Sequence, residues 1–257
     1  MRRAVLFVAG VALFLLALVV TAPASLIDGR LEALSAGRLR MASASGTLWS
    51  GAGEIRVMAG TSGIPVSWRI DALPILWGEL RGTLSGTDDA TPGSSFSLSA
   101  REISVRNVAL ALPAGALLRA AGAPSALATA GGNVGLRISE LTRRGDRMEG
   151  QVALRWDQAT LQAAVIGARP SPRIALGDVR FDGIGQGNAI AGTLANTGGD
   201  VDISGTVSVA LDGTARVDAL VRPRAGIDAE RASAISGALA LVGRPDGAGA
   251  FRITWAP

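Results

Sequence analysis

The sequence predicts a mainly β protein, in which an N-terminal transmembrane helix precedes a large antiparallel, folded-over β-sheet domain with a few short helices. Three observations predict this class. An apolar run opens the chain, apolar and polar residues alternate through most of the sequence beyond Leu39, and glycine-rich turns separate the alternating stretches in a chain with 34 glycines. Abundant glycine with only 11 prolines is more typical of many short strands joined by tight turns than of long helices.

The N-terminal segment, residues 1–24, is predicted to be a cytoplasmic N-terminus followed by a membrane anchor. Its apolar run, Ala4–Val20, reaches the length of about 17 to 25 residues that spans a bilayer as a helix. Arg2 and Arg3 favour a cytoplasmic N-terminus, with the bulk of the chain in the periplasm. The alternative is a cleaved signal peptide, because Ala22-Pro23-Ala24 imitates a cleavage site. The apolar run is longer than in most signal peptides, which favours an uncleaved single-pass anchor in the cell inner membrane.

Residues 25–37 are predicted to form a juxtamembrane helix, and residues 38–257 to form the periplasmic β domain. The helix follows from apolar residues at helical spacing, which are Leu26, Ile27, Leu31 and Leu34. Gly29 weakens that helix. From Leu39 onward the period of the apolar residues changes to two, which marks the start of the β domain.

Alternation is clearest in Val201–Asp212, where the apolar residues fall on one face of a strand and the polar residues on the other. The same pattern predicts strands at Glu54–Met58, Ser94–Ala100, Ile103–Leu112, Val134–Ile138, Met148–Trp156, Gly213–Val221 and Phe251–Trp255. Turn signals separate the strands at Gly131-Gly132, Arg144-Gly145-Asp146, Gly198-Gly199 and Asp212-Gly213. A sheet of about 14 strands is on the order of 65 Å wide, so it must twist or curl, and folding it over also covers its apolar face.

Three stretches break the strand rhythm and predict short helices. Asp71–Gly78 predicts a turn with a short helix, and Pro113–Gly122 begins with proline and ends with glycine, as helices often do. Ala229–Val242 is rich in alanine, has apolar residues on one side and stops at Gly243. Thr87–Ser95 is either a domain boundary or a long hairpin loop.

The missing residue types exclude most catalytic chemistry. The chain has no Cys, His or Tyr, and its 25 basic residues are all arginine. Thiol catalysis, histidine triads, histidine and cysteine metal sites and lysine Schiff bases are therefore excluded. An enzyme built on paired carboxylates, such as Asp178 and Asp182, is the remaining enzymatic alternative. The arginines are scattered and the net charge is only +4, so we expect no nucleic-acid partner. Because the usual catalytic and metal-binding residue types are missing, we also expect no catalytic residues, no cofactor and no metal.

Three local motifs favour structural readings over functional ones. Asp200-x-Asp202-x-Ser204-Gly205 resembles the start of a calcium loop, but its twelfth position is Leu211 instead of glutamate. Gly183–Gly187 lacks the spacing of a phosphate-binding loop and is read as a loop or a strand with close backbone approach. Arg143–Arg147 is either a site for an anionic partner or, as we favour, a solvated hairpin tip.

The five tryptophans, Trp49, Trp68, Trp77, Trp156 and Trp255, are read as core residues instead of a sugar or lipid platform. In a chain filled by Ala, Val and Leu, a buried indole supplies volume that the small side chains do not. Thr47–Trp49 is expected to form an early strand, with Gly46 and Gly51 allowing turns on either side and Trp49 mostly buried against aliphatic neighbours.

Several of these segments together resemble the type II secretion system protein N family. They are the anchor ending at Pro23-Ala24, then Gly46–Gly51 (GTLWSG), Trp68-Arg69-Ile70 with Leu76 and Gly78, Gly82-Thr83-Leu84, Gly131-Gly132, Gly150–Trp156, Leu176-Gly177, and a terminal aliphatic helix followed by Gly243 and Gly249–Trp255. The resemblance covers most of the chain in order, and its most specific piece is GTLWSG.

The resemblance implies a non-enzymatic inner-membrane protein whose periplasmic β domain supports export of folded proteins across the outer membrane. Its expected partners are other type II secretion components and the inner membrane. The family brings no catalytic residues to carry over. The implied fold also resembles the folded-over sheets of envelope-bridging and lipid-transfer proteins, so an envelope-spanning lipid-binding or lipid-transfer protein, with lipid as its partner, is the alternative.

Overall fold

The computed structural model describes residues 21–25, 29, 39–57, 63–86, 93–120, 128–163 and 173–256, and it divides into two compact units, Met1–Ala100 and Arg101–Pro257. The predicted anchor and juxtamembrane helix lie almost entirely outside the described residues, as does most of the Thr87–Ser95 loop. Within the described ranges, no helix is both long enough and apolar enough to cross a bilayer. The presence of a transmembrane helix therefore stays a prediction.

The first unit contains antiparallel strands that pair in sequence order. They are β1 (Leu39–Gly46), β2 (Ser50–Val57), β3 (Gly63–Asp71), β4 (Glu79–Gly86) and β5 (Ser94–Ser99). A short 3-10 helix, η1 (Leu73–Trp77), connects β3 to β4 and ends at Gly78 in the left-handed conformation, which confirms the helical turn predicted there.

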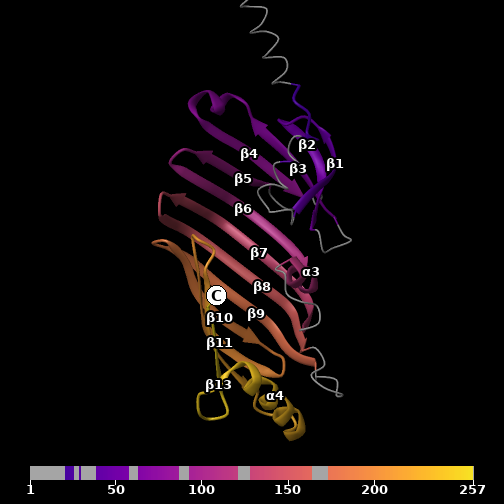
Figure 1. Ribbon diagram of the computed structural model, residues 1–257, viewed down its shortest axis with the longest axis vertical. Coiled ribbons are helices and arrows are strands. Elements are labelled where there is room, and N and C mark those ends of the chain that lie inside the picture. Colours follow the sequence, from indigo (N-terminus) through magenta and orange to yellow (C-terminus); the bar gives the residue numbers. More distant parts are fainter. Residues whose placement is uncertain are drawn as a thin grey trace, which may run out of the picture. The chain divides into compact units, whose positions relative to one another are not determined.

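The second unit is also an antiparallel, open sheet, in which β6 to β12 follow sequence order, and β6 to β11 are labelled in Figure 1. Strand β14 then lies between β12 and β13. Its strands are β6 (Glu102–Pro113), β7 (Ala128–Arg144), β8 (Arg147–Ala163), β9 (Arg173–Gln186), β10 (Ala189–Thr197), β11 (Val201–Ala210), β12 (Ala215–Pro223), β13 (Arg244–Pro245) and β14 (Phe251–Trp255). The predicted helices are present as α3 (Ala114–Ala120) and α4 (Ala229–Val242). The mainly antiparallel β class with few helices is therefore confirmed, whereas the folded-over form stays a prediction.

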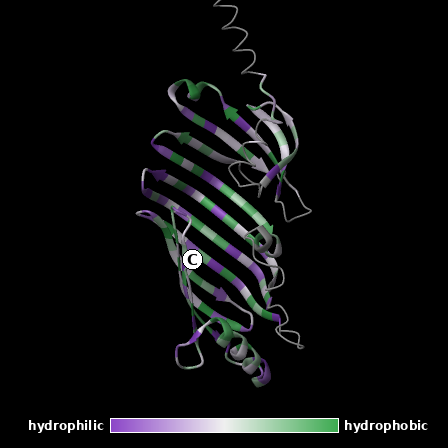
Figure 2. Ribbon diagram, in the orientation of Figure 1, coloured by the Kyte–Doolittle hydropathy of each residue, from purple (hydrophilic) through white to green (hydrophobic). Residues whose placement is uncertain are grey.

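Alternating side chains give the second unit one apolar and one polar sheet face, visible as alternating bands along the strands in Figure 2. The strand register aligns apolar residues into rows that run across the strands. One row contains Leu110, Leu136, Leu154, Phe181 and Leu194, and a second contains Val108, Ile138 and Val152. Most of these side chains are half-buried, and Leu110 is 45% exposed, so part of the apolar face meets solvent.

Helix α4 covers one end of this apolar face and completes the core of the second unit. Its first turn is capped by Asp228, whose carboxylate accepts a hydrogen bond from the backbone N–H of Arg231 at 2.7 Å. Ile235 and Leu239 face the sheet and are buried in a cluster with Val201, Val221 and Phe251, among others. Leu241 and Val242 face away and are exposed, so only one side of α4 contributes to the core.

The GTLWSG segment forms the turn between β1 and β2, and the expected strand at Thr47–Trp49 is wrong. The buried indole at this turn belongs to Trp68 on β3, which is 5% exposed, whereas Trp49 is half-buried. Trp68 Nε1 donates to the carbonyl oxygens of Thr47 at 3.3 Å and Leu48 at 3.1 Å. A Cβ at Gly51 would lie 2.5 Å from the Trp68 ring, so this glycine is required by packing.

Replacing Trp68 with phenylalanine should destabilise the first unit by about 2 kcal/mol, because two carbonyl groups lose their donor and the smaller ring leaves a gap. Amide hydrogen exchange of the full chain in mild detergent should show faster opening of β2 and β3. Trp255→Phe is the matched control, because Trp255 is 54% exposed and should tolerate the change. Equal exchange in the two variants would show that the indole does not hold the turn.

Two further expectations are corrected by the structure. Trp77 and Trp255 are not core residues, since they are 77% and 54% exposed, on the η1 turn and near the end of β14. Gly131-Gly132 is not a turn between strands but an irregularity inside β7, where the register with β8 shifts. Gly132 has a φ of +90°, a conformation that favours glycine and allows the strand to continue beyond the irregularity.

Candidate functional site

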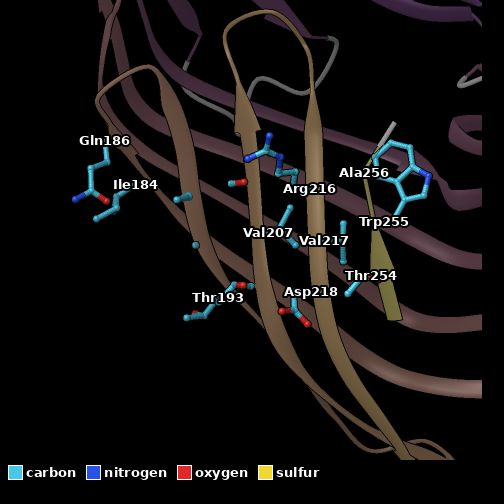
Figure 3. Close-up of a pocket in the computed structure, with 14 residues that line it drawn as sticks. Ile184, Gln186, Thr193, Val207, Arg216, Val217, Asp218, Thr254, Trp255 and Ala256 are labelled. Carbon is cyan, nitrogen blue, oxygen red and sulfur yellow. The ribbon is translucent and has the colours of Figure 1, made fainter. Parts of the chain in front are cut away.

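A hollow of about 800 Å³ in the second unit lies over β9 to β12 and β14 (Figure 3). The strand register places Thr193, Thr206, Asp218 and Thr254 in one row across its floor, on the polar face of the sheet. Ile184 and Trp255, both exposed, contribute apolar surface to the lining. The hollow is therefore open, and its lining is more apolar than polar, with a row of three threonines and Asp218 across its floor.

The carboxylates at this face are not arranged as a catalytic pair. Asp218 lies 3.4 Å from Arg252, which also contacts Asp246 at 3.3 Å. Asp178 and Asp182 lie on the same strand, four residues apart, so their Cα atoms are about 13 Å apart. Glycosidase-type pairs need carboxyl groups about 5 to 9.5 Å apart. The geometry therefore does not support the paired-carboxylate alternative.

The motif that resembles a calcium loop binds arginines and backbone groups. Asp200 accepts hydrogen bonds from Arg231 Nη2 at 2.7 Å and from the backbone N–H of Ala175 at 2.8 Å, and Asp202 lies 2.9 Å from Arg224 Nε. Hydrogen bonding by Arg231 holds the pKa of Asp200 below its ordinary value. Across the described ranges, no group of three or more acidic residues could hold a metal ion. Asp200 thus joins α4 to β9, whereas Asp202 joins β11 to the end of β12.

Asp200→Ala should lower the free energy of opening of α4 by about 1 to 2 kcal/mol at neutral pH, because Arg231 remains partly exposed and screened. Since folding lowers the pKa of Asp200, its contribution is complete above the ordinary aspartate pKa and is lost as the pH falls through the lower folded-state value. Hydrogen exchange at neutral and acidic pH measures both effects. Asp182→Ala, at an exposed position, is the control, and an equal cost in both variants would contradict the assignment.

The other two motifs have the structural roles expected from sequence. Gly183 lies inside β9, where a Cβ would meet the Phe181 ring at 2.6 Å, and Gly187 is in the turn before β10. Arg143–Arg147 spans the tip of the β7–β8 hairpin, with Arg144 paired to Glu102 at 2.9 Å. Both structural interpretations are confirmed.

The first unit carries an apolar turn, η1, whose position was predicted from the sequence but whose exposure was not. In η1, Leu73 is 69% exposed, and Leu76 and Trp77 are each 77% exposed. A hollow of about 410 Å³ beside this turn is lined by Ile75, Leu80 and Leu98, among others. The available signal was five consecutive residues, LPILW, with no polar neighbour between Ala72 and Gly78. Large apolar side chains that are exposed together often mark a surface for contact with another protein or with a membrane.

A comparison with models of protein families shows which family the chain matches. The family described as type II secretion system (T2SS), protein N, matches residues 37–254. The chain belongs to this family. The match begins near the predicted start of the β domain and includes most of both compact units. No curated protein and no solved structure matches the chain.

Membership of the protein N family decides the class of function. The family is a structural component of the type II secretion system and is not known as an enzyme family. As a member, this chain would work with other proteins of that system. The GTLWSG segment lies within the matched residues, where it forms the β1–β2 turn to which the Trp68 indole donates. The resemblance drawn from sequence is thus confirmed, although Trp49 itself is not the buried residue.

Proposed function

We propose that this chain is a non-enzymatic, single-pass inner-membrane protein whose periplasmic β domain supports export of folded proteins across the outer membrane. The family match over residues 37–254 carries this proposal. The apolar run Ala4–Val20 supports the anchor, and Arg2 and Arg3 support a cytoplasmic N-terminus. The chain then acts through its surfaces and edges, by contact with other secretion components.

The second unit offers long surfaces for such contacts. Strands β7 and β8 have 17 residues each, which gives each strand a length of about 55 Å. At the edge of the sheet, β13 pairs with Phe251 and Arg252 of β14. The pairing does not extend over Ile253–Trp255 in the described part of the chain, so this segment offers a place for strand addition by a partner.

Affinity purification of the tagged full chain from crosslinked membranes tests this proposal. We expect other type II secretion proteins to be enriched over a control in which the same tag is on a single-pass inner-membrane protein of another pathway. Enrichment of the same proteins in both samples would contradict the proposal. A variant with Thr254→Pro tests the edge of β14, since proline cannot donate a backbone hydrogen bond.

The apolar face of β6 to β9 favours lipid binding as a second candidate function. Its rows of leucine, isoleucine and valine are half-buried, and Leu110 is 45% exposed. Mass spectrometry of the purified full chain after detergent exchange should then detect bound lipid. Leu110→Arg should remove that lipid, whereas Ala109→Arg, on the opposite face of β6, should retain it. A wild-type chain free of lipid would exclude lipid binding and leave the structural role in secretion as the remaining candidate function.

A further inference from the structure

The exposed η1 turn combines the strongest apolar exposure in the described part of the first unit with a neighbouring apolar hollow. Leu73, Leu76 and Trp77 project from a single tight turn, and the hollow lined by Ile75, Leu80 and Leu98 adjoins them. An indole beside leucines is the composition found where a protein meets the headgroup and acyl boundary of a bilayer. Ala72–Gly78 contains no charged side chain that would resist such contact.

This turn lies at the end of its sheet where the chain enters from the predicted anchor. The backbone N–H of Leu48 in the β1–β2 turn donates to Ala22 at 2.8 Å, and the N–H of Ala24 donates to Gly46 at 3.3 Å. The same β1–β2 turn accepts a hydrogen bond from the N–H of Ile70, at 2.6 Å to the Trp49 carbonyl oxygen. Strand β3 ends at Asp71 and η1 begins at Leu73.

The segment Ala22–Ala24, through which the chain enters the first unit, therefore determines how close η1 is to the bilayer. Ala22–Ala24 directly follows the apolar run that we expect to span the bilayer. Neighbouring strands are about 4.8 Å apart, so η1 is within a few strand widths of this segment. A bilayer that holds the anchor would lie next to this end of the first unit.

The charges beside the turn favour contact with uncharged lipid headgroups over attraction to an anionic surface. Arg81 pairs with Glu79 at 2.7 Å, at the start of β4. Asp71 and Arg69 lie at the end of β3 and carry opposite charges. The formal charges of these flanking residues cancel, and burial of the apolar side chains remains as the driving force.

We propose that η1 and its hollow sit in the periplasmic face of the inner membrane, as a second bilayer contact beside the N-terminal anchor. This inference rests on the proposed anchoring. The contact fixes the first unit against the membrane instead of leaving it to move freely on a tether. The occupant of the apolar surface is phospholipid, with Leu76 and Trp77 at the deepest positions.

The absence of cysteine from the natural chain allows a site-specific test. Full-length Leu76→Cys and Trp77→Cys, each labelled with an environment-sensitive fluorophore, are reconstituted into phosphatidylcholine vesicles with and without nitroxide-labelled lipid. Leu241→Cys is the matched control, because Leu241 is apolar and 72% exposed, on α4 of the second unit. Co-flotation of the chain with the vesicles is measured in the same samples.

We expect blue-shifted emission that nitroxide lipid quenches at positions 76 and 77, with neither effect at position 241. Co-flotation without quenching at 76 and 77 overturns the contact while leaving the anchor in place. A blue shift without quenching also overturns it, because the turn is then covered by protein, in this sample a second copy. Quenching at all three positions overturns it in favour of general adsorption, and failure to co-float overturns both the contact and the anchor.

Discussion

Ile235→Ala is expected to lower the free energy of opening of α4 and the strands beneath it by about 3 kcal/mol. Ile235 is 1% exposed, at the centre of the cluster that α4 forms with β11, β12 and β14. Its replacement removes buried methyl and methylene groups and leaves a cavity between a helix and a sheet, which can collapse only partly. Hydrogen exchange of the full chain in mild detergent should show the loss in α4, β11 and β12.

Leu241→Ala is the control for this prediction. Leu241 is on the same helix but is 72% exposed, so the substitution should change stability by less than about 0.5 kcal/mol. A similar cost for both substitutions would show that α4 is stabilised by its own sequence and not by docking on the sheet. No cost for either would show that α4 does not contribute to the core.

Asn196→Ala is expected to destabilise the second unit by about 2 to 3 kcal/mol, because several backbone groups lose their partners together. Asn196 Nδ2 donates to the carbonyl oxygens of Leu176 at 2.6 Å and Val201 at 2.8 Å, and Oδ1 accepts from the N–H of Ile203 at 2.7 Å. The side chain thus replaces sheet hydrogen bonds where the β10–β11 hairpin turns. Faster exchange at Ile203 is the most specific expected signal.

Asn188→Ala provides the matched comparison, since Asn188 is exposed in the β9–β10 turn. We expect it to change stability by less than about 0.5 kcal/mol. Asn196→Asp should not rescue, because a carboxylate would face the two carbonyl oxygens to which the amide donates. Wild-type exchange rates in Asn196→Ala would show that water satisfies these backbone groups and that the side chain is dispensable.

Much of the fold was predictable because its signals are local. Alternation in Val201–Asp212 reflects a sheet with one apolar and one polar face, and β11 lies at Val201–Ala210. The helix at Ala229–Val242 has the predicted bounds, since its spacing matches one buried side and Asp228 and Gly243 flank it. Turns at Gly145-Asp146 and Gly198-Gly199 follow from residues that tolerate positive φ.

The roles of individual side chains depended on pairing across strands, which the sequence does not show. Trp49 and Trp68 were both predicted to be core residues. Only the Trp68 ring packs against the β1–β2 turn, where Gly51 leaves room for it. Asn196 looks like an ordinary polar residue until the hairpin brings Leu176 and Val201 to it. Trp77 was expected in a core, and its exposure follows from the tight η1 turn, which has no buried residue.

The family match makes this chain a component of the type II secretion system. The most direct measurement is the amount of a type II substrate released from cells that rely on this pathway, with the gene deleted and then restored. We expect deletion to leave folded substrate in the periplasm and the full chain to restore its release. Undiminished release after deletion would show that type II secretion does not need this chain.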